Sequence, residues 1–193
     1  MSEELNEELL EEVKKAVPYV LAALVAVAGY YGIKHHLAER RAAASAALTE
    51  AYTVEEMEDA VARFGGGKAG EALKIRLAKK YYDSARYEEA LSLYEELCGK
   101  TGAAFADIPE IGRAETLEAM GRTDEALAIY SAFAANNGGS YLALTANLGE
   151  VRCLARSDKA AALERLAALK ESAGDDEAAK ARIDALEDAV KRL

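Results

Sequence analysis

The stretch that decides the fold occurs twice along the chain. Residues 87–94 read YEEALSLY and residues 123–130 read TDEALAIY, which aligns Ala90 with Ala126 and Tyr94 with Tyr130. Repetition at a period of about 36 residues is typical of stacked helical hairpins. A small alanine lets two antiparallel helices cross within about 8–10 Å, and a residue four positions later lies on the same helix face. The sequence therefore predicts an all-α fold built from repeated hairpins.

A partner helix is expected just before each copy. Buried-type residues recur there at helical spacing: Leu77, Ala78 and Tyr81 before the first copy, and Ala114 and Leu117 before the second. A third, weaker unit spans residues 140–166, and a helix over 175–193 is expected to cap the stack. These offsets resemble the tetratricopeptide repeat. We therefore expect residues 68–193 to form a tetratricopeptide-like α-solenoid of about three hairpins plus a capping helix.

The region before the repeats contains an uncharged apolar stretch, residues 16–33, which reads AVPYVLAALVAVAGYYGI. At 1.5 Å per residue, a helix of this length spans roughly 27 Å, close to the hydrocarbon thickness of a thin bilayer. Tyr19 lies near one end, and Tyr30 and Tyr31 near the other, where aromatic rings favour the membrane interface. Pro18 falls in the first apolar turn, a position typical of a helix start. The stretch predicts a transmembrane helix through the lipid bilayer.

Two other interpretations of this stretch stay open. A buried core helix would normally keep one polar face, which this stretch lacks. A cleaved signal peptide would fit the small residues at Ala26 and Ala28, but the segment before the stretch is acidic, whereas signal peptides begin with positive charge.

Two segments flank the apolar stretch. Residues 1–15 form an acidic tail with leucines at helical spacing, including Leu5 and Leu9. Residues 34–67 are expected to form a helical connector, in which the anchor helix continues into an alanine-rich stretch. Thr53 and Glu56 have the spacing of a capping box, so a new helix should begin there and end at the glycines of residues 65–67.

Composition excludes several classes of function. The chain has 34 acidic and 24 basic residues and a net charge of −10, so we expect no nucleic-acid partner. Cys98 and Cys153 have no CxxC spacing and no nearby histidine, which disfavours a metal site, and both are expected to be small buried hydrophobic residues. No arrangement typical of a nucleophile or of paired catalytic carboxylates is found. We expect no enzyme, no cofactor and no small-molecule substrate.

The order of acidic tail, single apolar helix, alanine-rich connector and repeats resembles the YfgM-type family of membrane-anchored tetratricopeptide proteins, which are ancillary subunits of the bacterial Sec translocon. The resemblance covers nearly the whole chain. It implies a single-pass protein of the bacterial inner membrane, with a cytoplasmic N-terminus and a periplasmic repeat domain. It also implies translocon subunits, export clients or chaperones as partners. The basic residues on the two sides of the apolar stretch are nearly balanced, so this orientation depends on the resemblance.

Helical repeats of this kind bind peptides on the concave surface formed by the first helix of each pair. The resemblance places the following residues on that groove: Ile75, Lys79 and Tyr82 in the first unit, Ile111, Glu115 and Glu118 in the second, and Ala146 and Glu150 in the third. Packing between repeats or simple exposure to solvent is the alternative for each of them.

The leading functional prediction is a membrane-tethered protein-binding module that assists protein export or envelope protein folding at the translocon. A tether raises the effective concentration of a weak binder near its partner. The alternative is a structural scaffold or assembly factor of another envelope complex, such as division, pilus or secretion machinery. A varied set of captured clients would favour the first, and one stoichiometric partner the second.

Overall fold

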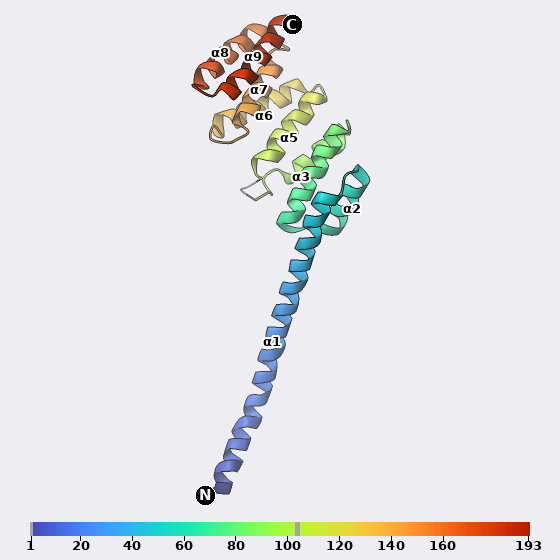
Figure 1. The fold of residues 1–193 in the computed structure, drawn as a ribbon, viewed down its shortest axis with the longest axis vertical. Helices are drawn as coiled ribbons and strands as arrows, with labels where there is room; N and C mark the ends of the chain where they lie inside the picture. The colour runs from blue at the N-terminus through green and yellow to red at the C-terminus, as the bar shows by residue number, and fades with distance from the viewer. Residues whose placement is uncertain (1, 103–104) are drawn as a thin grey trace. The chain divides into compact units, whose positions relative to one another are not determined.

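The computed structural model describes residues 2–102 and 105–193, and it describes all of their side chains except those of residues 2–9, 11 and 48. Over these residues the chain forms helices and turns without a β-strand, which confirms the all-α prediction (Figure 1). The helices are α1 (Ser2–Glu50), α2 (Val54–Phe64), α3 (Gly67–Asp83), α4 (Tyr87–Leu97), α5 (Asp107–Ala119), α6 (Thr123–Asn136), α7 (Ala143–Leu154), α8 (Lys159–Ser172) and α9 (Glu177–Arg192). The chain divides into two compact units, one ending at Ala46 and the other comprising Ala47–Leu193.

Helix α1 runs without interruption from the acidic tail through the apolar stretch. Pro18 lies inside α1. The prediction that this proline marks a helix start is therefore wrong, because the helix begins sixteen residues earlier, at Ser2. A proline at this position removes one hydrogen bond of the helix, that to the carbonyl of Lys14. The side chains of Leu5 and Leu9 lie outside the described ones.

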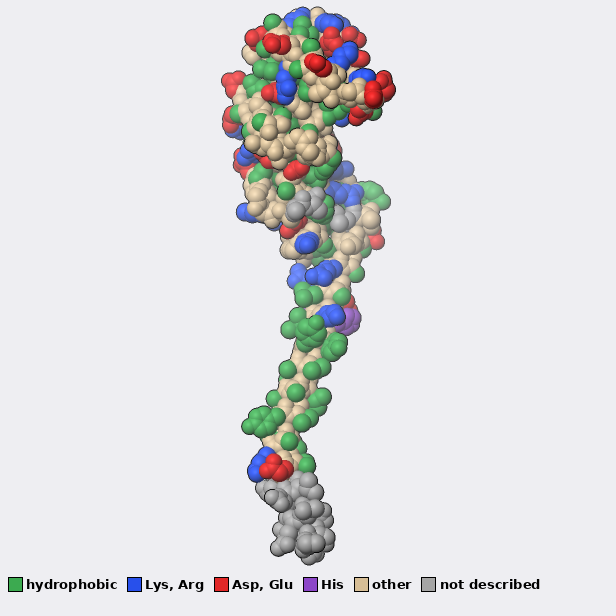
Figure 2. Space-filling view, turned by 90° about the vertical axis from the view of Figure 1, so that its left-hand side faces the viewer, with side chains coloured by type: hydrophobic (Ala, Val, Ile, Leu, Met, Phe, Trp, Pro, Cys, Tyr) green, Lys and Arg blue, Asp and Glu red, His purple; other side chains and the backbone are tan. Residues whose placement is uncertain are grey.

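By length and composition, residues Glu12–Ala47 of α1 can cross a membrane. The most apolar window has a mean hydropathy of 1.8, and none of it is buried within the structure. Figure 2 shows hydrophobic side chains along the middle of α1, with charged side chains on either side of them. The same length and composition also fit a signal sequence near the N-terminus.

The start of α2 confirms the predicted capping box. The backbone N–H of Glu56 donates to the Thr53 hydroxyl (3.1 Å), and the backbone N–H of Thr53 donates to the Glu56 carboxylate (3.0 Å). Backbone N–H groups of Thr53 and Tyr52 hold the pKa of Glu56 below its usual value, because they stabilise the charged form. The predicted glycine break is also confirmed, since α2 ends at Phe64 and α3 begins at Gly67.

From α2 to α9, each helix packs against the next one along the chain. In addition, α3 contacts α5, α5 contacts α7, and α7 contacts α9. The first helices of successive pairs therefore lie beside one another, and the pairs are α3–α4, α5–α6 and α7–α8, followed by α9.

The two copies of the repeated sequence form the centre of their hairpins. Ala90 and Ala126 are completely buried, and Tyr94 and Tyr130 are 3% and 0% exposed. The prediction that these alanines are close-packing points is confirmed by their burial. Ala90 and Tyr94 belong to one core cluster with Ala78, and Ala126 and Tyr130 belong to another with Ala114.

The turn inside each pair also repeats. Arg86 and Arg122 each precede a second helix, and each bonds a glutamate three residues later: Arg86 Nε donates to Glu89 (2.8 Å), and Arg122 Nε donates to Glu125 (2.7 Å). The preceding residue has a positive φ in both turns. It is glycine in one turn (Gly121, φ 79°) and alanine in the other (Ala85, φ 58°).

Both cysteines are free thiols. Cys153 is buried, as predicted, and burial raises its pKa to about 11. Cys98 is only half-buried, so the prediction of a buried residue is wrong for it, because it lies in the turn that follows α4.

Candidate functional site

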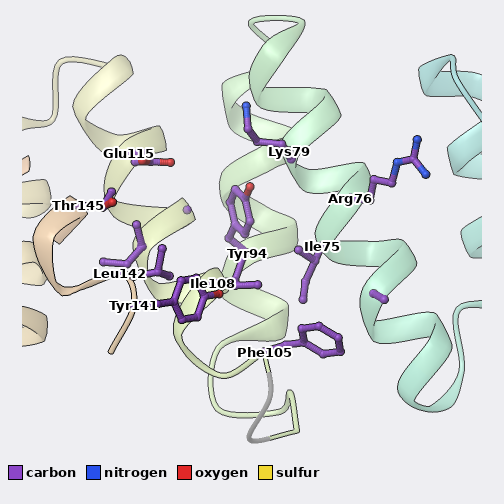
Figure 3. Close-up of a pocket in the computed structure, with 13 residues that line it drawn as sticks. Ile75, Arg76, Lys79, Tyr94, Phe105, Ile108, Glu115, Tyr141, Leu142 and Thr145 are labelled. Atoms are coloured by element: carbon purple, nitrogen blue, oxygen red, sulfur yellow. The ribbon is translucent and has the colours of Figure 1, made fainter. Parts of the chain in front are cut away.

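Helices α3, α4 and α5 and the start of α7 line an open cavity of about 490 Å³ in the unit Ala47–Leu193 (Figure 3). We call it the apolar cavity, because most of its lining is apolar or aromatic. These lining residues include Ile75, Tyr94, Phe105, Ile108, Ile111 and Leu142. The volume falls within the range of sites that hold ligands or several side chains, about 300–1,000 Å³.

A tyrosine and a glycine bring neighbouring helices together at the cavity wall. A Cβ atom at Gly112 would lie 2.4 Å from the ring of Tyr94, so only glycine allows α5 to approach α4 this closely. The same arrangement recurs one pair later, where a Cβ at Gly149 would lie 2.5 Å from the ring of Tyr130. Each tyrosine of a second helix therefore packs against a glycine of the next pair's first helix.

Charged groups lie at one end of the apolar cavity. Figure 3 shows Lys79 beside the hydroxyl end of Tyr94, Glu115 on the α5 side, and the Arg76 guanidinium turned away from Tyr94. Lys79 forms an ion pair with Asp83 on its own helix. The cavity is thus apolar at the Phe105 end and charged at the Glu115 end.

Next to this end lies a smaller cavity of about 250 Å³, which we call the charged cavity. Its lining includes Tyr82, Glu115, Glu118, Arg152 and Arg156. Glu118 accepts two hydrogen bonds from Arg152 (2.8 and 2.7 Å) and one from the Tyr130 hydroxyl (3.1 Å). Glu115 belongs to both cavities and so marks where they adjoin.

Burial and pairing shift the pKa values of these groups. Desolvation raises the pKa of Glu115 above its usual value, although Arg152 and Lys79 act in the opposite direction. The hydrogen bonds to Glu118 raise the pKa of Arg152, which keeps the guanidinium charged. Desolvation also raises the pKa of Tyr94 and of Tyr130, so both phenols stay neutral at physiological pH.

The predicted groove residues of the first two units all line these cavities. Ile75, Lys79, Ile111 and Glu115 line the apolar cavity, and Tyr82, Glu115 and Glu118 line the charged cavity.

The two groove positions predicted for the third unit are wrong. Ala146 is completely buried in a core cluster. Glu150 accepts hydrogen bonds from Ser131 of α6 and Arg165 of α8, and so faces the second helices. Thr145 and Arg152 line the cavities from α7 instead. Ala146 and Glu150 follow Ile111 and Glu115 by 35 residues, whereas the equivalent glycines of the two units, Gly112 and Gly149, are 37 residues apart, so the predicted register was off by two residues.

The sequence did not predict the apolar end of the larger cavity. Phe105 and Ile108 come from the turn before α5 and its first residues, and Tyr141 and Leu142 come from the segment before α7. No groove position was assigned to these segments, although Tyr141 and Leu142 lie at the start of the third unit. The available signal was a pair of large apolar residues, Tyr141 and Leu142, that follows Gly138, Gly139 and Ser140.

Within the described part of the chain, no group of three or more histidine, cysteine, aspartate or glutamate side chains is placed to hold a metal ion. Comparison with protein-family models, curated proteins and solved structures finds no match to this chain.

Proposed function

We propose that this protein is a membrane-tethered protein-binding module, in which α3–α9 form a tetratricopeptide-like stack and α1 crosses the membrane. The observation that carries the proposal is the apolar cavity, which lies between the first helices at positions where such a stack binds peptides. A preformed apolar cavity with a charged end provides the desolvated centre that dominates binding energy at protein interfaces.

The client of the cavity is a peptide segment of another protein. The resemblance to the YfgM-type family supports translocon subunits, export clients or chaperones as these partners, with the unit Ala47–Leu193 on the periplasmic side of the inner membrane. Tethering by α1 is consistent with the same role, because a tether raises the effective concentration of the binding site near its client, so a modest affinity suffices.

The membrane part of the proposal has its own test. Alkaline carbonate extraction of cell membranes is expected to leave the full-length chain in the membrane fraction. A shortened soluble protein that begins near Gly29 would show that the apolar stretch is a cleaved signal peptide.

Affinity capture from detergent-solubilised membranes tests the binding part, with Ala72→Phe as the decisive variant. Ala72 lines the apolar cavity and takes no part in the tyrosine–glycine contacts, so a phenylalanine there is expected to fill part of the space. The native chain is expected to capture a varied set of proteins that the variant loses. Capture that is equal for both would refute the cavity as the binding site, and one stoichiometric partner would favour the scaffold alternative.

A further inference from the structure

Glu115 is the carboxyl group that the two cavities share. Its side chain is partly buried on α5, and desolvation raises its pKa. Among the described residues, no group donates a hydrogen bond to this carboxyl and none forms an ion pair with it at contact distance. Glu115 is therefore a desolvated acid whose charge is not matched by a direct partner.

Two of the neighbouring cations, Arg152 and Lys79, are bound to other acids. Arg152 binds Glu118 through two hydrogen bonds, and Glu118 also accepts one from Tyr130. Lys79 is paired with Asp83 on the other wall. The Arg76 guanidinium is turned away from this end of the cavity (Figure 3). Arg156 also lines the charged cavity but forms no hydrogen bond or ion pair with Glu115 among the described residues, so the Glu115 carboxyl is left for a ligand to bind.

We propose that the groove selects peptide segments in which a lysine or arginine lies next to large apolar side chains. The apolar side chains occupy the apolar cavity, and the cation binds Glu115 at its charged end. The proposal rests on the proposed function, since it names the class of client that the same groove binds. Charge complementarity supports it, because an ion pair formed in a partly desolvated site is stronger than one in water.

The charge of the whole chain acts in the same direction. With a net charge of −10, the protein attracts basic segments and repels acidic ones at long range. A purely basic segment would bind weakly, because it leaves the apolar cavity unfilled.

Three fluorescein-labelled peptides of equal length test the proposal: one of leucine and lysine, one of leucine and glutamate, and one of serine and lysine. The full chain is placed in nanodiscs of zwitterionic phosphatidylcholine, and binding is measured by fluorescence anisotropy, with empty nanodiscs as the background. Glu115→Gln removes the charge at the site. Glu164→Gln is the matched control, since Glu164 is an exposed glutamate on α8 that lines neither cavity.

The leucine–lysine peptide is expected to bind most tightly. Glu115→Gln should weaken this binding by about tenfold and leave the leucine–glutamate peptide unaffected, because one charge-assisted contact is lost. Glu164→Gln should leave all three affinities unchanged.

Equal or tighter binding of the leucine–glutamate peptide, or no effect of Glu115→Gln, would overturn the selectivity and leave the peptide-binding function standing. Equal binding of the serine–lysine peptide would also overturn it, because the apolar cavity would then contribute nothing. Failure of both leucine peptides to bind would instead refute the proposed function itself.

Discussion

The helix pairs α3–α4 and α5–α6 have nearly the same buried interior, but they differ in the residues that line the two cavities. The buried alanine and tyrosine of one pair, Ala90 and Tyr94, recur in the other at the same spacing. On the face that lines the cavities, however, Lys79 corresponds to Glu115. Residues that hold a hairpin together must repeat, because the two helices of each pair pack against each other in the same way. Residues that line the cavities are free to differ, and the proposed binding site lies there.

Replacing the buried tyrosines should have the largest effect on stability, and it tests whether the two interiors are equivalent. Tyr130→Ala is expected to cost about 3–5 kcal/mol of unfolding free energy, because it empties a fully buried site. Tyr94→Ala should cost somewhat less, since the Tyr94 hydroxyl lacks the hydrogen bond that Tyr130 donates to Glu118. Chemical denaturation of the full chain in detergent measures the unfolding free energies of both variants. A loss below 1 kcal/mol for either variant would show that the two interiors are not equivalent.

The alanines provide the next test. Ala126→Leu and Ala90→Leu are each expected to cost roughly 1–3 kcal/mol, because an extra side chain overpacks a helix crossing with no free space. Ala128→Leu, at an exposed position of α6, is the control and should change stability little. Thermal unfolding compares the three variants. An unchanged midpoint for Ala126→Leu would contradict the close packing described above.

The turns are expected to respond differently, because they differ at one residue. Gly121→Ala should cost about 1 kcal/mol, since an alanine is strained at a φ of 79°. Ala85→Gly should change stability by less than about 0.5 kcal/mol, because relief of strain at φ 58° is offset by the greater freedom of glycine when unfolded. Denaturation midpoints of the two variants test this. Equal effects of opposite sign would show that strain alone governs the turns.

The smallest expected effect concerns Glu115, which lines both cavities. Its raised pKa means that the charged form is disfavoured in the folded protein, so Glu115→Gln should raise the melting temperature at neutral pH. As the pH falls through the raised pKa, the native carboxyl becomes protonated and the difference should vanish. Melting temperatures of the native and variant chains at several pH values measure this. A variant that is less stable at neutral pH would show that the carboxylate is structurally required.

Much of the fold could be predicted from the sequence, because its strongest signals are local. The capping box at Thr53, the glycine break before α3, and the alanine and tyrosine of each copy depend on spacing along one or two helices. Pro18 was placed wrongly, since the helical acidic tail before it extends α1.

The site was predicted only where it follows the repeat. The groove residues of α3 and α5 line the cavities because their positions recur with the period. The predicted groove positions of the third unit were wrong, because a shift in register moves every side chain to another face of its helix. Phe105, Tyr141 and Leu142 come from the segments just before α5 and α7, and their convergence on one cavity depends on tertiary packing.

Site-specific photocrosslinking in native membranes shows whether clients bind in the cavities between the first helices of the pairs. A photoreactive phenylalanine analogue replaces Tyr141, which lines the apolar cavity and is 71% exposed, or Tyr52, which lines neither cavity and is 69% exposed. If clients bind in the apolar cavity, position 141 should give client crosslinks that are lost in the Ala72→Phe background, and position 52 should give few. Equal crosslinking from the two positions, or crosslinks from position 141 that persist with the cavity filled, would contradict binding in this cavity.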